Sequence, residues 1–229
     1  MTVNASDSHL LPTLNQPQVL DLLSRLYAEA EASDAKVSAE EQALLSASGG
    51  IIDESTLAKI RDRSFMAVAP EVGRLMYLLV RGRRPTLVVE FGTSFGLSTI
   101  HMAAALRDNG FGRLVTTELS ETKVLRAAEH LEQAGLSNLV EIRKGDAFQT
   151  LVDLDPIDVL LLDGWKPLYL PMLKRLESAL SPNCLVMADD VISLAAKLGP
   201  YLAYVRDVRN GYVSCEIPID DGLELSIRT

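Results

Sequence analysis

Three aspartates and a lysine follow two short apolar runs, where they could bind a metal ion and move a proton. Asp163 and Lys166 come after the run Val159–Leu162, and the pair Asp189-Asp190 comes after the run Cys184–Ala188. If these runs are strands of one parallel sheet, their carboxyl ends open onto the same crevice and the carboxylates converge. Carboxylates that converge repel one another unless their negative charge is balanced, and a hard divalent cation is the simplest counterion. We therefore predict a site for Mg²⁺, or alternatively Mn²⁺ or Ca²⁺, formed by Asp163, Asp189 and Asp190; the alternative is that one of the adjacent pair is a solvated loop residue.

Lys166 lies three residues after Asp163, at the same predicted edge. A loop lysine is usually a solvated charge. Beside a divalent cation its ammonium form is disfavoured, so its pKa should fall toward the range of a general base, although the carboxylates act in the opposite direction. Trp165 is the single tryptophan of the chain. Simple packing is one interpretation of it, but next to these residues we expect a wall for an aromatic substrate or for an adenine.

A glycine-rich turn, Gly92-Thr93-Ser94-Phe95-Gly96, follows the apolar run Thr86–Phe91. Glycines let the backbone turn tightly and approach a ligand closely at the carboxyl end of a strand. The spacing departs from the G-x-G-x-x-G pattern of dinucleotide-binding enzymes, so NAD fits less well. Glu90, two residues before the first glycine, suits a ligand that carries an ammonium group.

Acidic residues also end the second and third apolar runs. Glu118 closes the run Leu114–Glu118, and a carboxylate there can accept hydrogen bonds from both hydroxyls of a ribose. The alternative is a solvated turn residue. Asp146 follows the run Leu139–Arg143, where it could reach the edge of an adenine and also serve as the N-cap of the next helix. Together with the glycine turn, these positions favour a cofactor that contains a nucleoside.

From Thr86 onward, short apolar runs alternate with longer amphipathic segments. This pattern indicates a parallel sheet covered by helices on both faces. The last two runs, Tyr212–Ile219 and Leu223–Arg228, flank Asp220-Asp221-Gly222, which is a hairpin signal. We therefore predict an α/β, doubly wound, mostly parallel sheet that ends in an antiparallel hairpin. The intervening helices are predicted near residues 96–107, 121–134, 147–152, 168–180 and 195–208.

The segment before Thr86 is predicted to be mainly helical. Apolar residues at helical spacing predict a helix over Gln16–Ala32, which the pair Ser33-Asp34 should end. A second helix is predicted over Ser38–Ser46, because Ser38 and Glu41 match a capping box. The glycine pair at residues 49–50 should end that helix.

A polar, poorly ordered tail is predicted over residues 1–14, and two more helices over Ser55–Arg63 and Pro70–Arg81. We divide the chain into residues 1–64, a tail and helices that form a lid and a surface for a homodimer, and residues 65–229, the catalytic domain.

Composition sets outer limits on function. The 229 residues are 48% hydrophobic and 23% charged, an ordinary globular balance. The net charge of −9 disfavours nucleic acid and membrane partners, and the densest basic cluster, at residues 81–84, fits a solvated turn. Two cysteines, Cys184 and Cys215, in no metal or redox spacing, and no signal-like N-terminus lead us to expect a cytoplasmic protein. The histidines form no site, since we expect His9 in the tail and structural or exposed roles for His101 and His130.

The chain resembles the metal-dependent class I O-methyltransferases, the family that includes the catechol and caffeoyl-CoA enzymes. The matching stretches run in family order from about residue 65 to the C-terminus: MAVAPEVGRLMYLL, VVEFGTSFGLSTIHMA, TTELS, GDA, LLDGWKPLYL, ADDV and DGLELSIR. LDGWK followed by ADDV and LAYVR is most similar to the catechol enzyme. The resemblance implies a seven-stranded sheet with its last strand antiparallel, and S-adenosylmethionine as the methyl donor.

The resemblance also implies roles for individual residues. Asp163, Asp189 and Asp190 match the metal ligands, and Lys166 matches the base. The cofactor-binding residues implied or expected are Met66, Val68, Glu90, Gly92, Ser98, Glu118, Asp146, Ala147, Asp163 and Trp165. Among them, Glu90, Gly92 and Ser98 would hold the methionine part of the cofactor.

Three positions depart from the family pattern. Asp190 stands where asparagine is common, which should bind a cation more tightly but leave it a weaker acid toward the substrate. Gly164 stands where the catechol enzyme has a larger residue. Cys215, with Glu216 next to it on the opposite face, stands near the position of a substrate-binding glutamate.

The expected reaction is methyl transfer to one of two vicinal oxygens of a small phenolic molecule, with Lys166 taking the proton and the metal chelated by both oxygens. The alternatives are a nucleotide-binding oxidoreductase, disfavoured by the glycine spacing, and a cofactor-binding protein without catalysis, disfavoured by Lys166.

Overall fold

A computed structural model describes residues 11–229. Residues 1–10, with His9 and most of the predicted tail, lie outside the described residues. Over residues 11–14 the prediction of a poorly ordered tail is wrong, because Thr13–Asn15 form a short 3-10 helix, η2, in which Leu14 is buried. The amide and the hydroxyl of Thr13 donate to the carboxylate of Asp108, at 3.0 and 2.6 Å.

Seven strands form one sheet in the order β3-β2-β1-β4-β5-β7-β6. Strands β1 to β5 pair in parallel, whereas β7 runs antiparallel to β5 and to β6. The predicted doubly wound sheet with an antiparallel C-terminal hairpin is thereby confirmed. The strands are β1 (Leu87–Phe91), β2 (Arg113–Glu118), β3 (Val140–Lys144), β4 (Ile157–Leu162), β5 (Leu180–Asp189), β6 (Tyr212–Ile217) and β7 (Leu223–Arg228).

Helices cover both faces of the sheet, because the central strands are apolar on both sides. In β4, Leu160 and Leu162 pack in the cluster formed with α6, α7 and α8, whereas Val159 and Leu161 pack in the cluster formed with α3 and α4. The helices are α3 (Pro70–Arg83), α4 (Leu97–Asn109), α5 (Glu121–Gln133), α6 (Ala147–Thr150), α7 (Tyr169–Leu176) and α8 (Ala195–Val205), with 3-10 turns η3 (Ser137–Leu139), η4 (Lys166–Leu168), η5 (Glu177–Ala179) and η6 (Val208–Asn210). Predicted and observed elements agree to within a few residues here.

Helix α1 is continuous from Pro17 to Ala47, so the predicted break at Ser33-Asp34 and the second helix starting at Ser38 are wrong. Serine and aspartate end a helix when their side chains bond to their own backbone. Here these two side chains bond instead to residues 63–66: Ser33 Oγ donates to the carbonyl of Arg63 at 2.6 Å, and Asp34 accepts from the following segment. The glycine pair at residues 49–50 does follow the end of the helix, as predicted.

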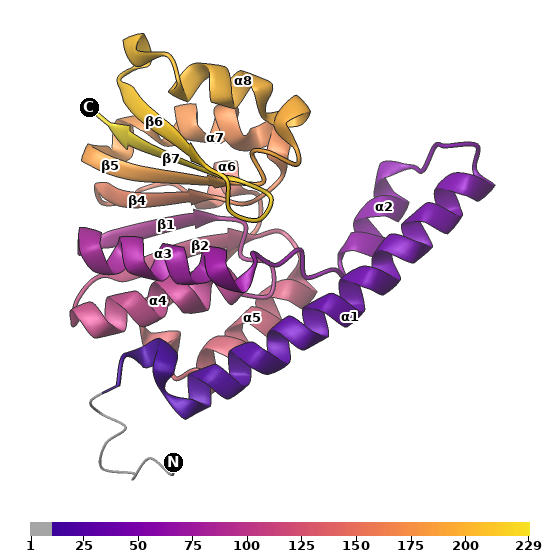
Figure 1. Ribbon diagram of the computed structural model, residues 1–229, viewed down its shortest axis with the longest axis horizontal. Coiled ribbons are helices and arrows are strands. Elements are labelled where there is room, and N and C mark those ends of the chain that lie inside the picture. Colours follow the sequence, from indigo (N-terminus) through magenta and orange to yellow (C-terminus); the bar gives the residue numbers. More distant parts are fainter. Residues whose placement is uncertain (1–10) are drawn as a thin grey trace.

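The N-terminal half of α1 packs against the domain through buried residues such as Val19, Leu22 and Leu26. Its C-terminal half and α2 (Glu54–Arg61) project away from the sheet (Figure 1). We call residues 33–61 the arm. None of the helices within residues 11–229 combines the length and the apolar character that crossing a membrane requires.

The strand order reverses between β1 and β4, which creates the crevice where open α/β sheets bind ligands. The carboxyl ends of β1, β4 and β5 therefore lie side by side. His101 and His130 are buried on α4 and α5, where they bond to the hydroxyl of Tyr27 and to the carbonyl of Phe95. This placement agrees with the prediction that the two histidines are structural.

Candidate functional site

The carboxylates of Asp163, Asp189 and Asp190 meet at the ends of β4 and β5. Each offers one oxygen such that all three oxygens lie within 4.8 Å of one another. Asp189 is buried, and the side chains of Asp163 and Asp190 are 12% and 25% exposed. The structure thus brings together the three predicted metal ligands, two of them because β4 and β5 are parallel neighbours.

The electrostatics of this cluster favour a bound cation. Burial raises the pKa of Asp163 and of Asp189, and repulsion from Asp190 raises both further. Several ionised carboxylates in a partly desolvated place are costly, and a divalent cation removes that cost. The donor set, three carboxylate oxygens, is the one that Mg²⁺, Mn²⁺ and Ca²⁺ prefer. The residues therefore fit a hard divalent cation.

Lys166 lies inside the same cluster. Its Nζ is 2.6 Å from Asp190 Oδ2 and 3.1 Å from Asp163 Oδ1, and its side chain is 13% exposed. Burial lowers the pKa of Lys166, but Asp163 and Asp190 outweigh that effect, so the pKa is raised above its usual value. The predicted fall in this pKa does not occur in the protein alone. The carboxylates, which act against it, dominate there.

Tyr169 is a part of the site that the sequence analysis did not assign. It is fully buried, its hydroxyl accepts a hydrogen bond from Lys166 Nζ at 2.8 Å, and it donates to the carbonyl of Asp189 at 3.3 Å. The hydroxyl therefore links the lysine to the end of β5. Its spacing from Lys166, three residues along a helical turn, was the available signal.

The glycine-rich turn approaches the end of β4 very closely. Gly92 has a φ of +102°, and a Cβ there would lie 2.7 Å from the carbonyl oxygen of Asp163. A side chain at this position would therefore push β1 and β4 apart where the ligands meet. Gly164 is also constrained, because a Cβ there would lie 2.6 Å from the ring of Phe91. The ring of Phe91 therefore leaves no room for a side chain at position 164, where the sequence departs from the family pattern.

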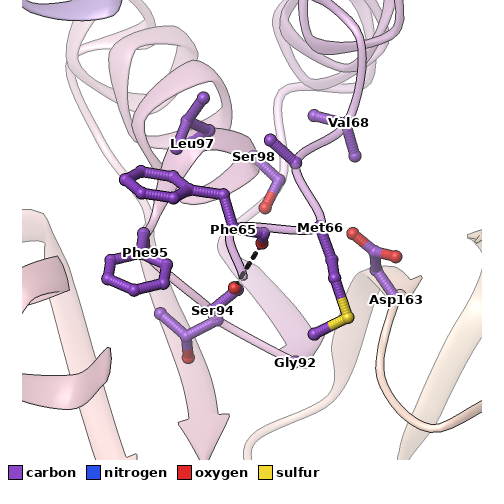
Figure 2. A pocket seen from close by; sticks show the side chains of 11 residues that line it. Phe65, Met66, Val68, Gly92, Ser94, Phe95, Leu97, Ser98 and Asp163 are labelled. Atoms are coloured by element: carbon purple, nitrogen blue, oxygen red, sulfur yellow. Dashed lines mark hydrogen bonds between the residues drawn. The ribbon is translucent and has the colours of Figure 1, made fainter. Parts of the chain in front are cut away.

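A pocket lies between the glycine turn and the segment that precedes α3. Figure 2 shows Met66 and Val68 on one side of it, Ser94 and Ser98 on another, and Asp163 at its edge. Its lining residues are Phe65, Met66, Ala67, Val68, Gly92, Thr93, Ser94, Phe95, Leu97, Ser98 and Asp163. Five of the predicted cofactor-binding residues therefore border one pocket: Met66, Val68, Gly92, Ser98 and Asp163.

Glu90 does not border this pocket but lies fully buried behind it. Its carboxylate accepts hydrogen bonds from Ser98 Oγ and Thr99 Oγ1, each at 2.6 Å. Burial raises its pKa to about 7, although both hydroxyls act to lower it. Glu90 can therefore act on a ligand through the Ser98 hydroxyl and through its charge.

Glu118 stands at the end of β2, next to the pocket wall. Its two carboxylate oxygens accept from the amides of Ser94 and Ser120, both at 2.9 Å. Asp146 follows β3 and caps α6 by accepting from the amide of Phe148 at 2.9 Å, so the predicted N-cap is observed. Glu118, Asp146 and the buried Ala147 do not line the pocket. Glu118 is nevertheless bonded to Ser94, which does line it.

Two other predicted positions lie farther out. Trp165 is 51% exposed, and the guanidinium of Arg61, from the arm, lies 5.8 Å from its ring centre. Cys215 is exposed on β6, and Glu216 pairs with Arg206 at 2.8 Å. Cys215 and Glu216 do not contribute to the pocket beside the glycine turn.

Comparisons with known proteins agree with this arrangement. A family model described as a methyltransferase domain matches residues 89–191, which contain the glycine turn and the acidic cluster. The chain is 32% identical over 158 residues to the catechol O-methyltransferase of Niastella koreensis, covering 67% of this chain and 67% of that relative. It is 35% identical over 150 residues to the catechol O-methyltransferase of Mus musculus, covering 62% of this chain and 55% of that relative. The match thus spans about two thirds of the first relative and just over half of the second.

A solved structure extends the likeness beyond the matched sequence. The O-methyltransferase TomG of Streptomyces achromogenes, involved in tomaymycin synthesis and solved in complex with S-adenosylmethionine, aligns with a TM-score of 0.66 at 24% identity. The alignment covers 88% of this chain and 99% of that one. At this identity the likeness shows a shared fold.

Proposed function

Because the chain belongs to the family of S-adenosylmethionine-dependent O-methyltransferases that includes the catechol enzymes, we propose that it methylates a hydroxyl of a small catechol-like molecule with the help of a divalent cation. The observation that carries the proposal is the cluster of Asp163, Asp189, Asp190 and Lys166 beside the pocket at the end of β1.

Asp163, Asp189 and Asp190 would hold the cation, for which Mg²⁺ is the first choice and Mn²⁺ or Ca²⁺ are alternatives. When bound, a divalent cation supplies Lewis acidity, which makes a hydroxyl of the substrate easier to ionise. The carboxylate of Asp190, where the family commonly has an amide, adds a negative charge that favours cation binding.

Lys166 is the proposed general base, and Tyr169 is proposed to hold its amine in place. With a cation bound to the carboxylates, the ammonium form of Lys166 would be disfavoured and its amine would be neutral. The neutral amine would then take the proton of the substrate hydroxyl, and the oxygen would attack the methyl carbon of the sulfonium. The new bond is C–O, the broken bond is C–S, and its electron pair stays on sulfur. Since the lysine is already tied to Tyr169 and the end of β5, its position is fixed before the substrate arrives.

The cofactor is proposed to lie along the ends of β1, β2 and β3. Gly92, Ser98 and, behind it, Glu90 would hold its methionine part, and Met66 and Val68 would line its sulfonium side. Glu118 would bind ribose hydroxyls, and adenine would be bordered by Asp146, Ala147 and Trp165.

Two vicinal oxygens on the substrate are the simplest match to a cation that keeps open positions beyond its three protein ligands. We place the catalytic unit in residues 65–229 and assign residues 1–64 the role of a lid, with a surface that two copies can share. Arg61, whose guanidinium lies 5.8 Å from the ring centre of Trp165, brings the end of the arm beside that residue.

The test is methyl transfer from labelled S-adenosylmethionine in the presence of Mg²⁺. Catechols are compared with phenols that differ only in lacking the second hydroxyl. We expect turnover of the catechols and at least a hundredfold lower kcat/KM for the monophenols, since they lose one of two anchoring oxygens. Equal turnover of a catechol and its matched monophenol would exclude a substrate with two vicinal oxygens. Cofactor binding without methyl transfer to any catechol would favour the alternative of a cofactor-binding protein without catalysis.

A further inference from the structure

We propose that Asp34 is a positioning residue for the cofactor pocket, in that it fixes the segment Ser64–Met66, which forms one wall of that pocket. The identity of the cofactor in this inference rests on the proposed function. The coupling between Asp34 and the pocket rests on the contacts described next.

One carboxylate on α1 serves three donors in succession. Asp34 Oδ1 accepts from the hydroxyl of Ser64 at 2.7 Å and from the amide of Phe65 at 2.6 Å, and Oδ2 accepts from the amide of Met66 at 3.1 Å. Hydrogen bonds to an ionised acceptor are stronger than neutral ones. The segment lies outside the helices and strands, so no helical or sheet hydrogen bonds fix Phe65 and Met66, and the bonds to Asp34 help to set their path.

The glycine-rich turn after β1 contacts the same segment from the other side. Ser94 Oγ donates to the carbonyl of Phe65 at 2.6 Å, the contact drawn in Figure 2. The rings of Phe65 and Phe95 stack with their centres 4.0 Å apart. Phe65 is therefore held between Asp34 on the arm and the turn that follows β1, and its backbone is one of the links between α1 and the pocket.

Met66 shows that the segment needs external support. Its φ is +46°, in the left-handed region that residues with a Cβ rarely adopt. Such conformations persist where the surrounding structure determines them, and they gather at ligand sites. The amide of Met66 is the donor to Asp34 Oδ2, and its side chain, 56% exposed, lies at the pocket beside Gly92 and Asp163 (Figure 2).

Loss of the Asp34 carboxylate should therefore loosen the pocket wall but leave the acidic cluster intact. The reacting groups, Lys166 and the three aspartates, lie at and just after the ends of β4 and β5, and within residues 11–229 none of them forms a hydrogen bond or ion pair with Asp34. The expected kinetic result is a raised KM for S-adenosylmethionine with kcat near the wild-type value once the cofactor saturates. A general loss of folding would lower both.

The experiment compares Asp34→Ala and Asp34→Asn with Asp53→Ala. Asp53 is the matched control, because it lies on the same arm and accepts three comparable hydrogen bonds, from Ser55 Oγ, Thr56 N and Thr56 Oγ1. Binding of S-adenosylmethionine to the full chain is measured by calorimetry. We expect about a tenfold or greater loss of affinity for Asp34→Ala and no change for Asp53→Ala. The loss should be smaller for Asp34→Asn, which keeps Oδ1 as an acceptor but places an amide nitrogen, which cannot accept from Met66, where Oδ2 was.

Wild-type affinity in Asp34→Ala, or an equal loss in Asp53→Ala, would overturn the inference. If Asp34→Ala does not fold, Asp34→Asn and Ser64→Ala decide the matter, since each removes only part of the anchor, and wild-type affinity in both would also overturn it. Failure of the proposed function looks different: the wild-type chain would then bind no S-adenosylmethionine at all.

Discussion

Lys166 Nζ lies 2.6 Å from Asp190 Oδ2, and this pair joins the end of β4 to the end of β5. The lysine also bonds to Asp163 and to the hydroxyl of Tyr169. Its ammonium is thus fixed among the carboxylates proposed to bind the cation. With a cation bound to those oxygens, the ammonium form would be disfavoured, and the neutral amine would be the proposed acceptor of the proton of the substrate hydroxyl.

Replacement of Lys166 should remove the proposed base. Lys166→Ala should lower kcat by about 10²–10⁴-fold, the usual effect of a positioned proton acceptor. Lys166→Arg should not restore activity, because a guanidinium stays protonated. Steady-state kinetics over pH 6–9 measure the effect, and Lys174→Ala, which changes a lysine of α7 that lies over Tyr204, is the control. A near-normal kcat in Lys166→Ala would assign the proton to another group or to water.

Tyr169 should matter because its hydroxyl orients that lysine. Tyr169→Phe should lower kcat about tenfold, which corresponds to one hydrogen bond to a charged group. Tyr201→Phe is a matched control: Tyr201 is equally buried, packs edge-on against Tyr169 with ring centres 5.8 Å apart, and is not bonded to Lys166. Equal effects of the two substitutions on kcat would mean that only packing is disturbed.

Glu118 should contribute to cofactor affinity. Glu118→Ala removes the proposed acceptor for ribose and also releases the amides of Ser94 and Ser120. We expect S-adenosylmethionine binding to weaken by roughly 1–3 kcal/mol in calorimetry. Glu121→Ala, which removes an exposed carboxylate paired with Lys144 at the start of α5, should leave the affinity unchanged. Unchanged affinity in Glu118→Ala would reject the ribose assignment.

His101 should make folding stability depend on pH. Burial lowers its pKa from 6.5 to about 4, and the nearby charge of Arg74 adds to the effect. The unfolded chain therefore takes up a proton more readily than the folded one between these values. The stability is undiminished by this group above pH 6.5 and falls by up to roughly 3 kcal/mol as the pH decreases toward 4.

Denaturant unfolding at a series of pH values checks this expectation. The free energy of unfolding should fall more steeply with acid in the wild type than in His101→Gln, which cannot titrate. Parallel curves would show that the imidazole has an ordinary pKa in the folded protein.

Much of the fold could be predicted because its signals are local. Each strand of the parallel sheet is a short apolar run followed by a turn, and the order of these elements along the chain fixes which strand ends meet. That rule alone predicts that Asp163 and Asp189 lie close together. Asp190 followed as their neighbour, and Gly92 followed from the turn after β1.

What the sequence did not reveal depends on contacts between distant segments. Ser33 and Asp34 have the composition of a helix end, but their partners are residues 63–66, so α1 continues past them. The pKa of Lys166 depends on the balance between burial and two carboxylates, which requires their distances. The sequence also did not reveal that Glu90 is fully buried behind Ser98, where two hydroxyls from the first turn of α4 donate to its carboxylate.

Activity with and without a divalent cation is the decisive measurement for the proposed metal site. The protein is stripped of divalent cations with a chelator, its metal content is verified, and methyl transfer from S-adenosylmethionine to a catechol is followed as Mg²⁺ is restored. We expect no turnover without metal, recovery on addition of Mg²⁺, and much weaker recovery when Asp163→Ala or Asp189→Ala removes a ligand. Full turnover by the verified metal-free protein would rule out the proposed role of the cation.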